Sequence, residues 1–163
     1  MSQNTLLRLL ADGAVHSGES LARQLEVSRT AIWKQIQKLQ SEGLVVHRIR
    51  GKGYQLAESL DLLDEQEILQ ALPESQSSHV KLEVRSATVS TNTDVQLRWQ
   101  QGETGLLVTI ADSQSGGRGR QGRQWISPPG QNLYISFGFS IARGFAGLEG
   151  LSLVAGLALV RAL

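Results

Sequence analysis

A run of interleaved glycine and arginine at residues 116–125 constrains the fold of this chain more than any other feature. The run holds four glycines and three arginines and ends at Trp125. Apolar, strand-like segments flank it at 106–111 and 132–137, so we expect a long loop between two strands of one sheet. Arginine offers a fixed charge with a planar fork of donors, and glycine lets the backbone approach a ligand closely. The loop is therefore predicted to bind an anion, although a flexible RNA-binding tract has a similar composition.

Charge is distributed unevenly along the chain. Residues 1–60 carry eight Lys/Arg and five Asp/Glu, and residues 61–163 carry eight and ten, so the two parts have net charges of +3 and −2. The basic first part indicates a polyanionic partner. The chain has no cysteine, which excludes disulfides and cysteine-based metal sites or nucleophiles. We predict no metal site, because the histidines are scattered, and a cytoplasmic location, because the N-terminus lacks the blocks of a signal peptide.

The first 60 residues have the pattern of a winged helix-turn-helix. Helices are expected at 6–10 and 18–25, and a third from an N-cap at Ser28 to a stop at Gly43. On this third helix Ile32, Ile36 and Leu39 repeat at helical spacing and are predicted to pack inward. The hairpin expected at 44–56 would form the wing.

The opposite face of the third helix and the wing are rich in polar and basic side chains, as a DNA-binding surface requires. The residues predicted to contact DNA are Ser28, Arg29, Thr30, Trp33, Lys34 and Gln37 on the helix, and Arg48, Arg50 and Lys52 on the wing. Two alternatives remain open: Trp33 can cap the core instead, and the whole region can be a small helical domain with a solvated polar face.

A second domain is predicted over residues 61–163. Asp64 and Glu67 resemble a capping box for a helix at 65–72, the tract 73–78 is polar and turn-rich, and a strand is expected at 80–84. Ser90, Thr91 and Asn92 lie before a helix expected at 94–100, where spacing alone favours a simple helix cap over a ligand site. The apolar stretch 151–163 is too short to span a bilayer and is predicted to be a buried core helix.

Three motifs together resemble the biotin-protein ligases: Ser90-Thr91-Asn92, Gln114 with the Gly/Arg run through Trp125, and residues 132–136. With the winged helix in front, the chain is similar to their bifunctional subclass, the biotin operon repressors. The resemblance covers essentially all 163 residues, and the Gly/Arg motif is highly specific. It implies an α+β fold in which the winged helix precedes the first part of a mixed-sheet catalytic domain like that of class II synthetases.

The resemblance implies an enzyme that joins biotin to ATP, with Mg²⁺, as biotinyl-5′-AMP and then transfers biotin to a lysine of the biotin carboxyl carrier protein. It also implies repression through biotin operator DNA by a homodimer that the adenylate strengthens, with no membrane partner. Arg118, Arg120 and Arg123 would neutralise charge during the reaction. The residues implied to bind biotin or the adenylate are Ser90, Thr91, Asn92, Gln114, Gly117, Arg118, Gly119, Arg120 and Trp125, with Gly122 also giving the backbone access to the ligand.

The sequence departs from the family pattern at one point. The family continues with a Lys-Trp-Pro-Asn-Asp segment and a small C-terminal barrel, whereas the last lysine here is Lys81 and the apolar helix at 151–163 has no C-cap. We therefore expect a truncated member whose catalytic domain is incomplete and, taken alone, poorly active. Two other functions compete with the ligase: a winged-helix regulator that senses a ligand without catalysis, and a nucleic-acid-binding module that uses both the wing and the Gly/Arg loop.

Overall fold

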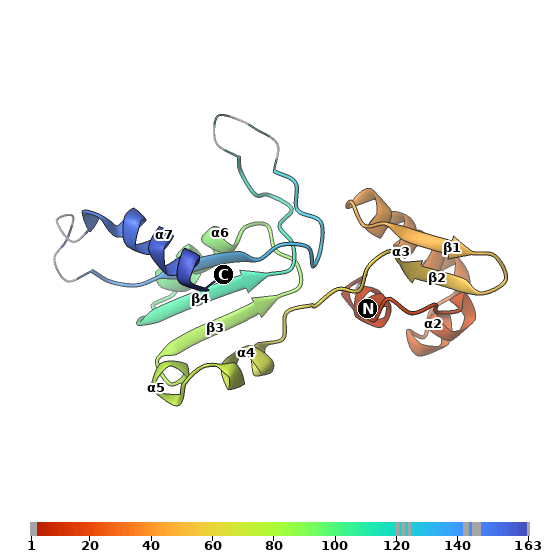
Figure 1. Ribbon diagram of the computed structural model, residues 1–163, viewed down its shortest axis with the longest axis horizontal. Coiled ribbons are helices and arrows are strands. Elements are labelled where there is room, and N and C mark those ends of the chain that lie inside the picture. Colours follow the sequence, from red (N-terminus) through yellow and green to blue (C-terminus); the bar gives the residue numbers. More distant parts are fainter. Residues whose placement is uncertain are drawn as a thin grey trace.

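The computed structural model describes residues 3–119, 121, 123, 125–141, 144 and 148–162. These residues form an α+β structure with two separate sheets, a two-stranded hairpin and a three-stranded sheet (Figure 1). The N-terminal part contains α1 (Gln3–Leu10), α2 (Gly18–Gln24), α3 (Arg29–Ser41), β1 (Val46–Ile49) and β2 (Gly53–Leu56). The following part contains α4 (Glu65–Ala71), α5 (Glu74–Ser77), β3 (Val80–Arg85), α6 (Thr91–Gln100), β4 (Leu106–Ala111), β5 (Tyr134–Gly138) and α7 (Leu151–Ala162).

The N-terminal part is a winged helix-turn-helix, as predicted. The Ser28 hydroxyl oxygen accepts a hydrogen bond from the Ala31 N–H at 3.1 Å, which confirms Ser28 as the N-cap of α3. The inward stripe of Ile32, Ile36 and Leu39 is buried. One apolar core joins these three side chains to residues of α1, α2 and the wing, namely Leu6, Leu7, Leu10, Leu21, Ala22, Leu25, Leu44, Val46 and Leu56.

The wing is an antiparallel pair of β1 and β2, in register from Val46 opposite Leu56 to Ile49 opposite Gly53. The free edge of β2 is also paired, because Tyr54 exchanges two backbone hydrogen bonds with His16, at 2.9 and 2.8 Å. The segment before α2 therefore acts as a short third strand. It fixes the wing against the helices, so the basic turn between the strands is held in a defined position.

The second sheet has the order β3-β4-β5, with β3 parallel and β5 antiparallel to β4. The central strand β4 is almost entirely buried, and α6 packs on the sheet through the buried Val95, which lies so close to Gly138 that a side chain there would overlap it. The loop predicted between two strands of one sheet is confirmed, since residues 112–133 connect β4 to β5. The bounds of three elements differ from the predicted ones. The helix expected at 94–100 begins at Thr91, the strand expected at 132–137 begins at Tyr134, and part of the tract 73–78, expected to form turns, is the helix α5.

Residues 60–63 connect the two parts and contact both. Leu60 and Leu62 pack against the core of the winged helix, while the Leu63 N–H donates to Asp112 Oδ1 at 3.1 Å. Arg8 on α1 donates to the Leu63 carbonyl at 3.0 Å. Residues 60–63 therefore contact both parts of the chain. The domain boundary between residues 60 and 61 stays a prediction.

Asp112 is a buried carboxylate at this junction. It is 2% exposed, and its Oδ2 has no hydrogen-bond partner among the described residues. Burial raises the pKa of Asp112, and the Leu63 N–H and the positive charge of Arg8 offset this only in part. The folded protein therefore holds the Asp112 proton more tightly than the unfolded chain does.

We expect the stability cost of ionising Asp112 to appear as pH rises. The cost is absent below the unfolded-state pKa and complete above the raised folded-state pKa, so stability is lost across that window. Asp112→Asn cannot ionise and should gain stability relative to the wild type as the pH rises from the unfolded-state pKa of Asp112 through its raised folded-state pKa. Urea denaturation of both proteins at several pH values measures the difference, and a difference that does not change with pH would contradict the expectation.

The helix α7 corrects one prediction. The stretch 151–163 was expected to be a buried core helix, but α7 has no buried residue, and Leu153 is 78% exposed. Its apolar side chains point to every side, and no other described element covers them. Within the described residues, no helix combines the length and the apolar character needed to cross a membrane.

Candidate functional site

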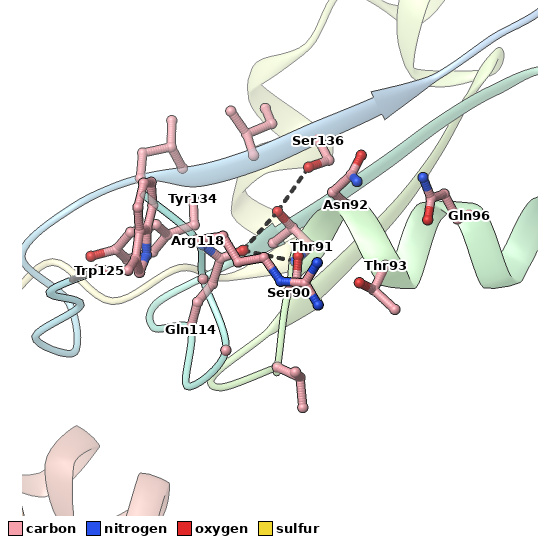
Figure 2. A pocket seen from close by; sticks show the side chains of 15 residues that line it. Ser90, Thr91, Asn92, Thr93, Gln96, Gln114, Arg118, Trp125, Tyr134 and Ser136 are labelled. Atoms are coloured by element: carbon pink, nitrogen blue, oxygen red, sulfur yellow. Dashed lines mark hydrogen bonds between the residues drawn. The ribbon is translucent and has the colours of Figure 1, made fainter. Parts of the chain in front are cut away.

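The candidate site lies where the parallel strands β3 and β4 reach their carboxyl ends. Ligands of open α/β sheets commonly bind at such edges, because the segments leaving neighbouring strands diverge there. The segment after β3 carries Ser90, Thr91 and Asn92, and the segment after β4 carries Gln114, Gly117 and Arg118. Together with Trp125 and residues of β5 they surround a cleft of about 710 Å³ (Figure 2).

Thr91 is the hub of hydrogen bonding in the cleft, and it is only 3% exposed. Its backbone N–H and its hydroxyl both lie within reach of Gln114 Oε1, at 2.8 and 3.1 Å, and its hydroxyl also lies 2.8 Å from the Ser136 hydroxyl (Figure 2). A backbone N–H can only donate, so the amide oxygen of Gln114 faces Thr91. The amide NH₂ of Gln114 has no partner among the described residues and remains available to a ligand.

Trp125 and Tyr134 form an aromatic wall of the cleft. Their ring centroids are 6.1 Å apart with a tilt of 56°, a geometry that aromatic pairs favour. Trp125 is 42% exposed, so much of its indole remains free for a further contact. Gly117 lies directly against the indole, and a β-carbon there would overlap it, which explains why this position suits glycine.

The predicted ligand residues are brought together only in part. Ser90, Thr91, Asn92, Gln114, Gly117, Arg118 and Trp125 all line the cleft. Gly119 packs against the backbone of Arg123, and neither of these two residues is part of the lining. Arg120 and Gly122 lie outside the described residues. Of the three arginines proposed for catalysis, Arg118 therefore lines the cleft and Arg123 does not.

Two groups of lining residues had no role predicted from the sequence, although residues 132–136 belong to the motif that resembles the ligases. Tyr134 and Ser136 on β5 face the cleft, and the signal for them was their i, i+2 spacing, which places both side chains on one face of a strand. Thr93 and Gln96 lie on the first turns of α6. The simple-cap interpretation of Ser90 also needs correction, because Ser90 occupies the N-cap position of α6 but its side chain makes no capping hydrogen bond.

The electrostatics of the cleft are simple. Arg118 is the one charged side chain in the described lining, and the other polar groups are hydroxyls and amides. Such a surface suits a neutral ligand with several donors and acceptors that continues into an anionic group near Arg118. Among the described residues, no cluster of three or more His, Asp or Glu could hold a metal ion.

A second candidate surface lies on the winged helix. All nine residues predicted to contact DNA are exposed. Arg29, Arg48, Arg50 and Lys52 line one cleft of about 540 Å³ between the wing and the N-terminal ends of α2 and α3. Trp33 is 46% exposed, so about half of its indole is accessible to a partner, and its contact with DNA stays a prediction. The surface therefore combines a helix with polar side chains and an adjacent basic hairpin.

Comparisons with known proteins match two separate segments of the chain. Residues 2–55 match a family described as HTH domain, and residues 84–163 match the biotin/lipoate A/B protein ligase family. The chain is 42% identical over 159 residues to the bifunctional ligase/repressor BirA of Salmonella typhimurium, which covers 98% of this chain and 48% of that protein.

The protein of the same name from Escherichia coli K12 is 40% identical over 167 residues, or 100% of this chain and 50% of the relative. That of Bacillus subtilis 168 is 38% identical over 122 residues, or 74% of this chain and 37% of the relative. The chain spans about half the length of the first two relatives. Residues 84–163 of the chain thus belong to the biotin/lipoate A/B protein ligase family, and a segment that matches an HTH domain lies in front of them.

Proposed function

We propose that this chain supplies the biotin- and adenylate-binding residues of a biotin-protein ligase that also represses transcription. In the proposed reaction the biotin carboxylate attacks the α-phosphorus of ATP, which forms biotinyl-5′-AMP and releases pyrophosphate. The amine of a lysine on the biotin carboxyl carrier protein then attacks the acyl carbon and releases AMP. The observation that carries the proposal is the convergence of Ser90, Gln114, Arg118 and Trp125 on one cleft.

The cleft provides a role for each group. Biotin has a polar ureido ring that needs matched donors and acceptors when it is buried, and Ser90, Asn92 and the free Gln114 NH₂ can supply them. Arg118 can neutralise the carboxylate and the α-phosphate, which repel each other before they react. Arg120 and Arg123 stay proposed for the same task. The exposed face of Trp125 can stack against adenine.

The described lining does not fit a divalent cation held by the protein. Mg²⁺ prefers carboxylate oxygens and substrate phosphates, and neither Asp nor Glu lines the cleft. We therefore assign no residue to Mg²⁺. We propose that Mg²⁺ would enter the cleft bound to the phosphates of ATP, whose charge it would partly neutralise.

The ligase is tested by two measurements on the same protein. Calorimetry with biotin reports binding, and exchange of labelled pyrophosphate into ATP reports adenylate formation. We expect binding, and exchange that occurs only when biotin is present. Binding without exchange would favour a regulator that senses biotin without catalysis, and the absence of binding would contradict both functions.

The DNA-binding part of the proposal predicts a specific effect of Arg48→Ala. An arginine on the wing that neutralises a phosphate releases counterions on binding, independently of DNA sequence. Affinity for a mixed-sequence DNA duplex should fall about fivefold, and the slope of log affinity against log salt should become shallower by about 1. Fluorescence anisotropy across a salt series measures both quantities.

Arg118→Ala is the matched control, because it removes the same charge from the Gly/Arg loop. We expect it to leave DNA affinity in the absence of ligand unchanged. If Arg118→Ala weakens DNA binding as much as Arg48→Ala does, the loop itself binds nucleic acid, and the chain is a nucleic-acid-binding module instead of a ligase.

We further propose that the adenylate promotes a homodimer that binds the operator. Ordering a glycine-rich segment costs conformational entropy, so a ligand that orders it in advance makes later association easier. Sedimentation at saturating biotin and ATP should show increased self-association, and unchanged self-association would contradict the coupling. We also propose a cytoplasmic location, where operator DNA and a carrier protein would both be accessible.

A further inference from the structure

The two segments that carry the proposed ligand-binding residues stay hydrogen-bonded to each other beyond the ends of β3 and β4. The Asp112 N–H donates to the Arg85 carbonyl at 3.0 Å, and the Thr88 N–H donates to the Ser113 carbonyl at 3.1 Å. The Ser115 N–H then donates to the Thr88 carbonyl at 2.8 Å. Thr88 therefore stands between the segment that leads to Ser90 and the segment that carries Gln114.

The next pair continues this ladder into the Gly/Arg loop. The Gly116 N–H donates to the Val89 carbonyl at 2.9 Å, and Gly116 is packed so closely on Val89 that a β-carbon would overlap its side chain. The positions of Gly117 and Arg118 follow directly from this contact. The spacing between the two walls of the cleft thus depends on how firmly residues 88 and 89 are held.

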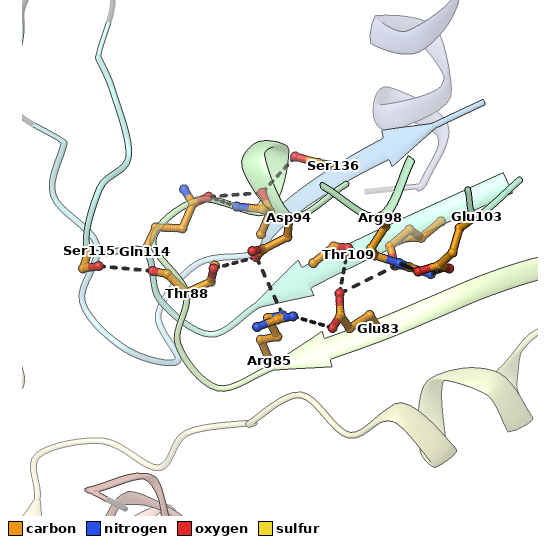
Figure 3. Close-up of polar contacts among 12 residues, drawn as sticks. Glu83, Arg85, Thr88, Asp94, Arg98, Glu103, Thr109, Gln114, Ser115 and Ser136 are labelled. Carbon is orange, nitrogen blue, oxygen red and sulfur yellow. Dashed lines mark hydrogen bonds and ion pairs between the residues drawn. The ribbon is translucent and has the colours of Figure 1, made fainter. Parts of the chain in front are cut away.

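The side chain of Thr88 ties this junction to the helix that begins with the hub residue of the cleft. Its hydroxyl donates to Asp94 Oδ2 at 2.5 Å, and Asp94 lies in the first turn of α6 (Figure 3). Arg85 Nε approaches the same carboxylate oxygen at 3.7 Å. The Asp94 side chain is 16% exposed, so water screens these charge-assisted interactions only partly.

The interaction extends from Asp94 on α6 to Arg85 on β3, and along β3 to Glu83. Arg85 Nη2 lies 2.6 Å from Glu83 Oε1, and Glu83 Oε2 lies 3.9 Å from Arg98 Nη1 (Figure 3). At the far end of this network Arg98 pairs with Glu103 at 2.8 Å. Among the described residues, neither Arg98 nor Glu103 forms a hydrogen bond or ion pair with a residue that lines the cleft. The network therefore has one end near the cleft and one end remote from it.

We propose that Thr88 and Asp94 are positioning residues for the cleft. The Thr88 hydroxyl, held by the Asp94 carboxylate, fixes the turn that carries Ser90 to Asn92 against the segment that carries Gln114 to Arg118. This inference rests on the proposed function for the identity of the ligand. The geometry that carries it is independent of any ligand.

Thr88→Val tests the proposal, because valine keeps the shape and the β-branch of threonine and removes the hydroxyl. The full chain is studied by calorimetry with biotin and, without ligand, by amide hydrogen exchange at Ser115 and Gly116. We expect Thr88→Val to bind biotin about tenfold more weakly, because the two segments would hold the binding-competent spacing only part of the time, and to exchange these two amides faster. Thr88→Ser, which restores the hydroxyl, should return both quantities to wild-type values.

Glu103→Gln is the control for a merely structural role. It weakens the ion pair with Arg98 at the far end of the network, so it should lower the thermal unfolding midpoint without changing biotin affinity or exchange at Ser115 and Gly116. The proposal is overturned if Thr88→Val behaves like Glu103→Gln. A wild-type chain that binds no biotin would contradict the proposed function, while the exchange rates would still decide whether Thr88 holds the two segments together.

Discussion

Replacing Gln114 with glutamate should weaken biotin binding on the order of 100-fold while leaving the fold intact. The two donors of Thr91 require an acceptor at this position, and a carboxylate oxygen serves them as well as the amide oxygen does. The second oxygen of glutamate then replaces the NH₂ that faces the cleft. The NH₂ donor is thus replaced by a negatively charged oxygen that can only accept hydrogen bonds. This oxygen repels a ligand carbonyl that the NH₂ would bind.

Gln96→Glu is the matched control for this substitution. Gln96 is exposed and lines the same cleft, and no hydrogen bond fixes its side chain among the described residues. The Gln96→Glu substitution introduces the same negative charge into the cleft. Because this charge is exposed and screened by water, we expect less than a threefold change in biotin affinity. Calorimetry with biotin and thermal unfolding of both variants give the comparison. Equal losses for the two variants would show that general electrostatics, and not the direction of the Gln114 amide, determines binding.

The cleft could be predicted from the sequence to the extent that its residues follow strand ends. Ser90 and Gln114 come shortly after two apolar runs, and the carboxyl ends of parallel strands meet at one edge of a sheet. The role of Thr91 as a buried hub could not be predicted, because it depends on Ser136, a residue 45 positions away. The place of Arg123 was also beyond prediction, since a long loop has no periodicity that assigns a direction to its side chains.

Local rules explain why the winged helix was predicted well. Its N-cap at Ser28 and its stripe of Ile32, Ile36 and Leu39 are set by residues within a few positions of one another. The same rules fail for α7, because hydrophobicity indicates a tendency to be buried but does not say which surface will cover the helix. The short helix α5 shows the converse, since a turn-rich composition is compatible with a single helical turn that starts after Pro73.

Gly53→Ala should destabilise the winged helix by about 3 kcal/mol or more, the largest stability effect we expect. Gly53 has φ of +140°, a conformation that side chains with a β-carbon rarely adopt. A β-carbon there would overlap the His16 carbonyl and approach Ser17 Cα at 2.7 Å. The His16 carbonyl accepts the hydrogen bond from the Tyr54 N–H at 2.8 Å, so it cannot move aside without releasing β2. The wing should be displaced, and DNA affinity should fall together with stability.

Gly51→Ala separates the clash from the backbone conformation. Gly51 lies in the turn just before Gly53 with φ of +73°, and a β-carbon there meets nothing within 4 Å. Its substitution should therefore cost only the left-handed conformation, about 1 kcal/mol. Urea denaturation of the two variants measures the difference between these costs. If both substitutions cost the same, contact with His16 does not hold the wing, and its orientation must be set by the apolar residues of β1 and β2 that reach the core.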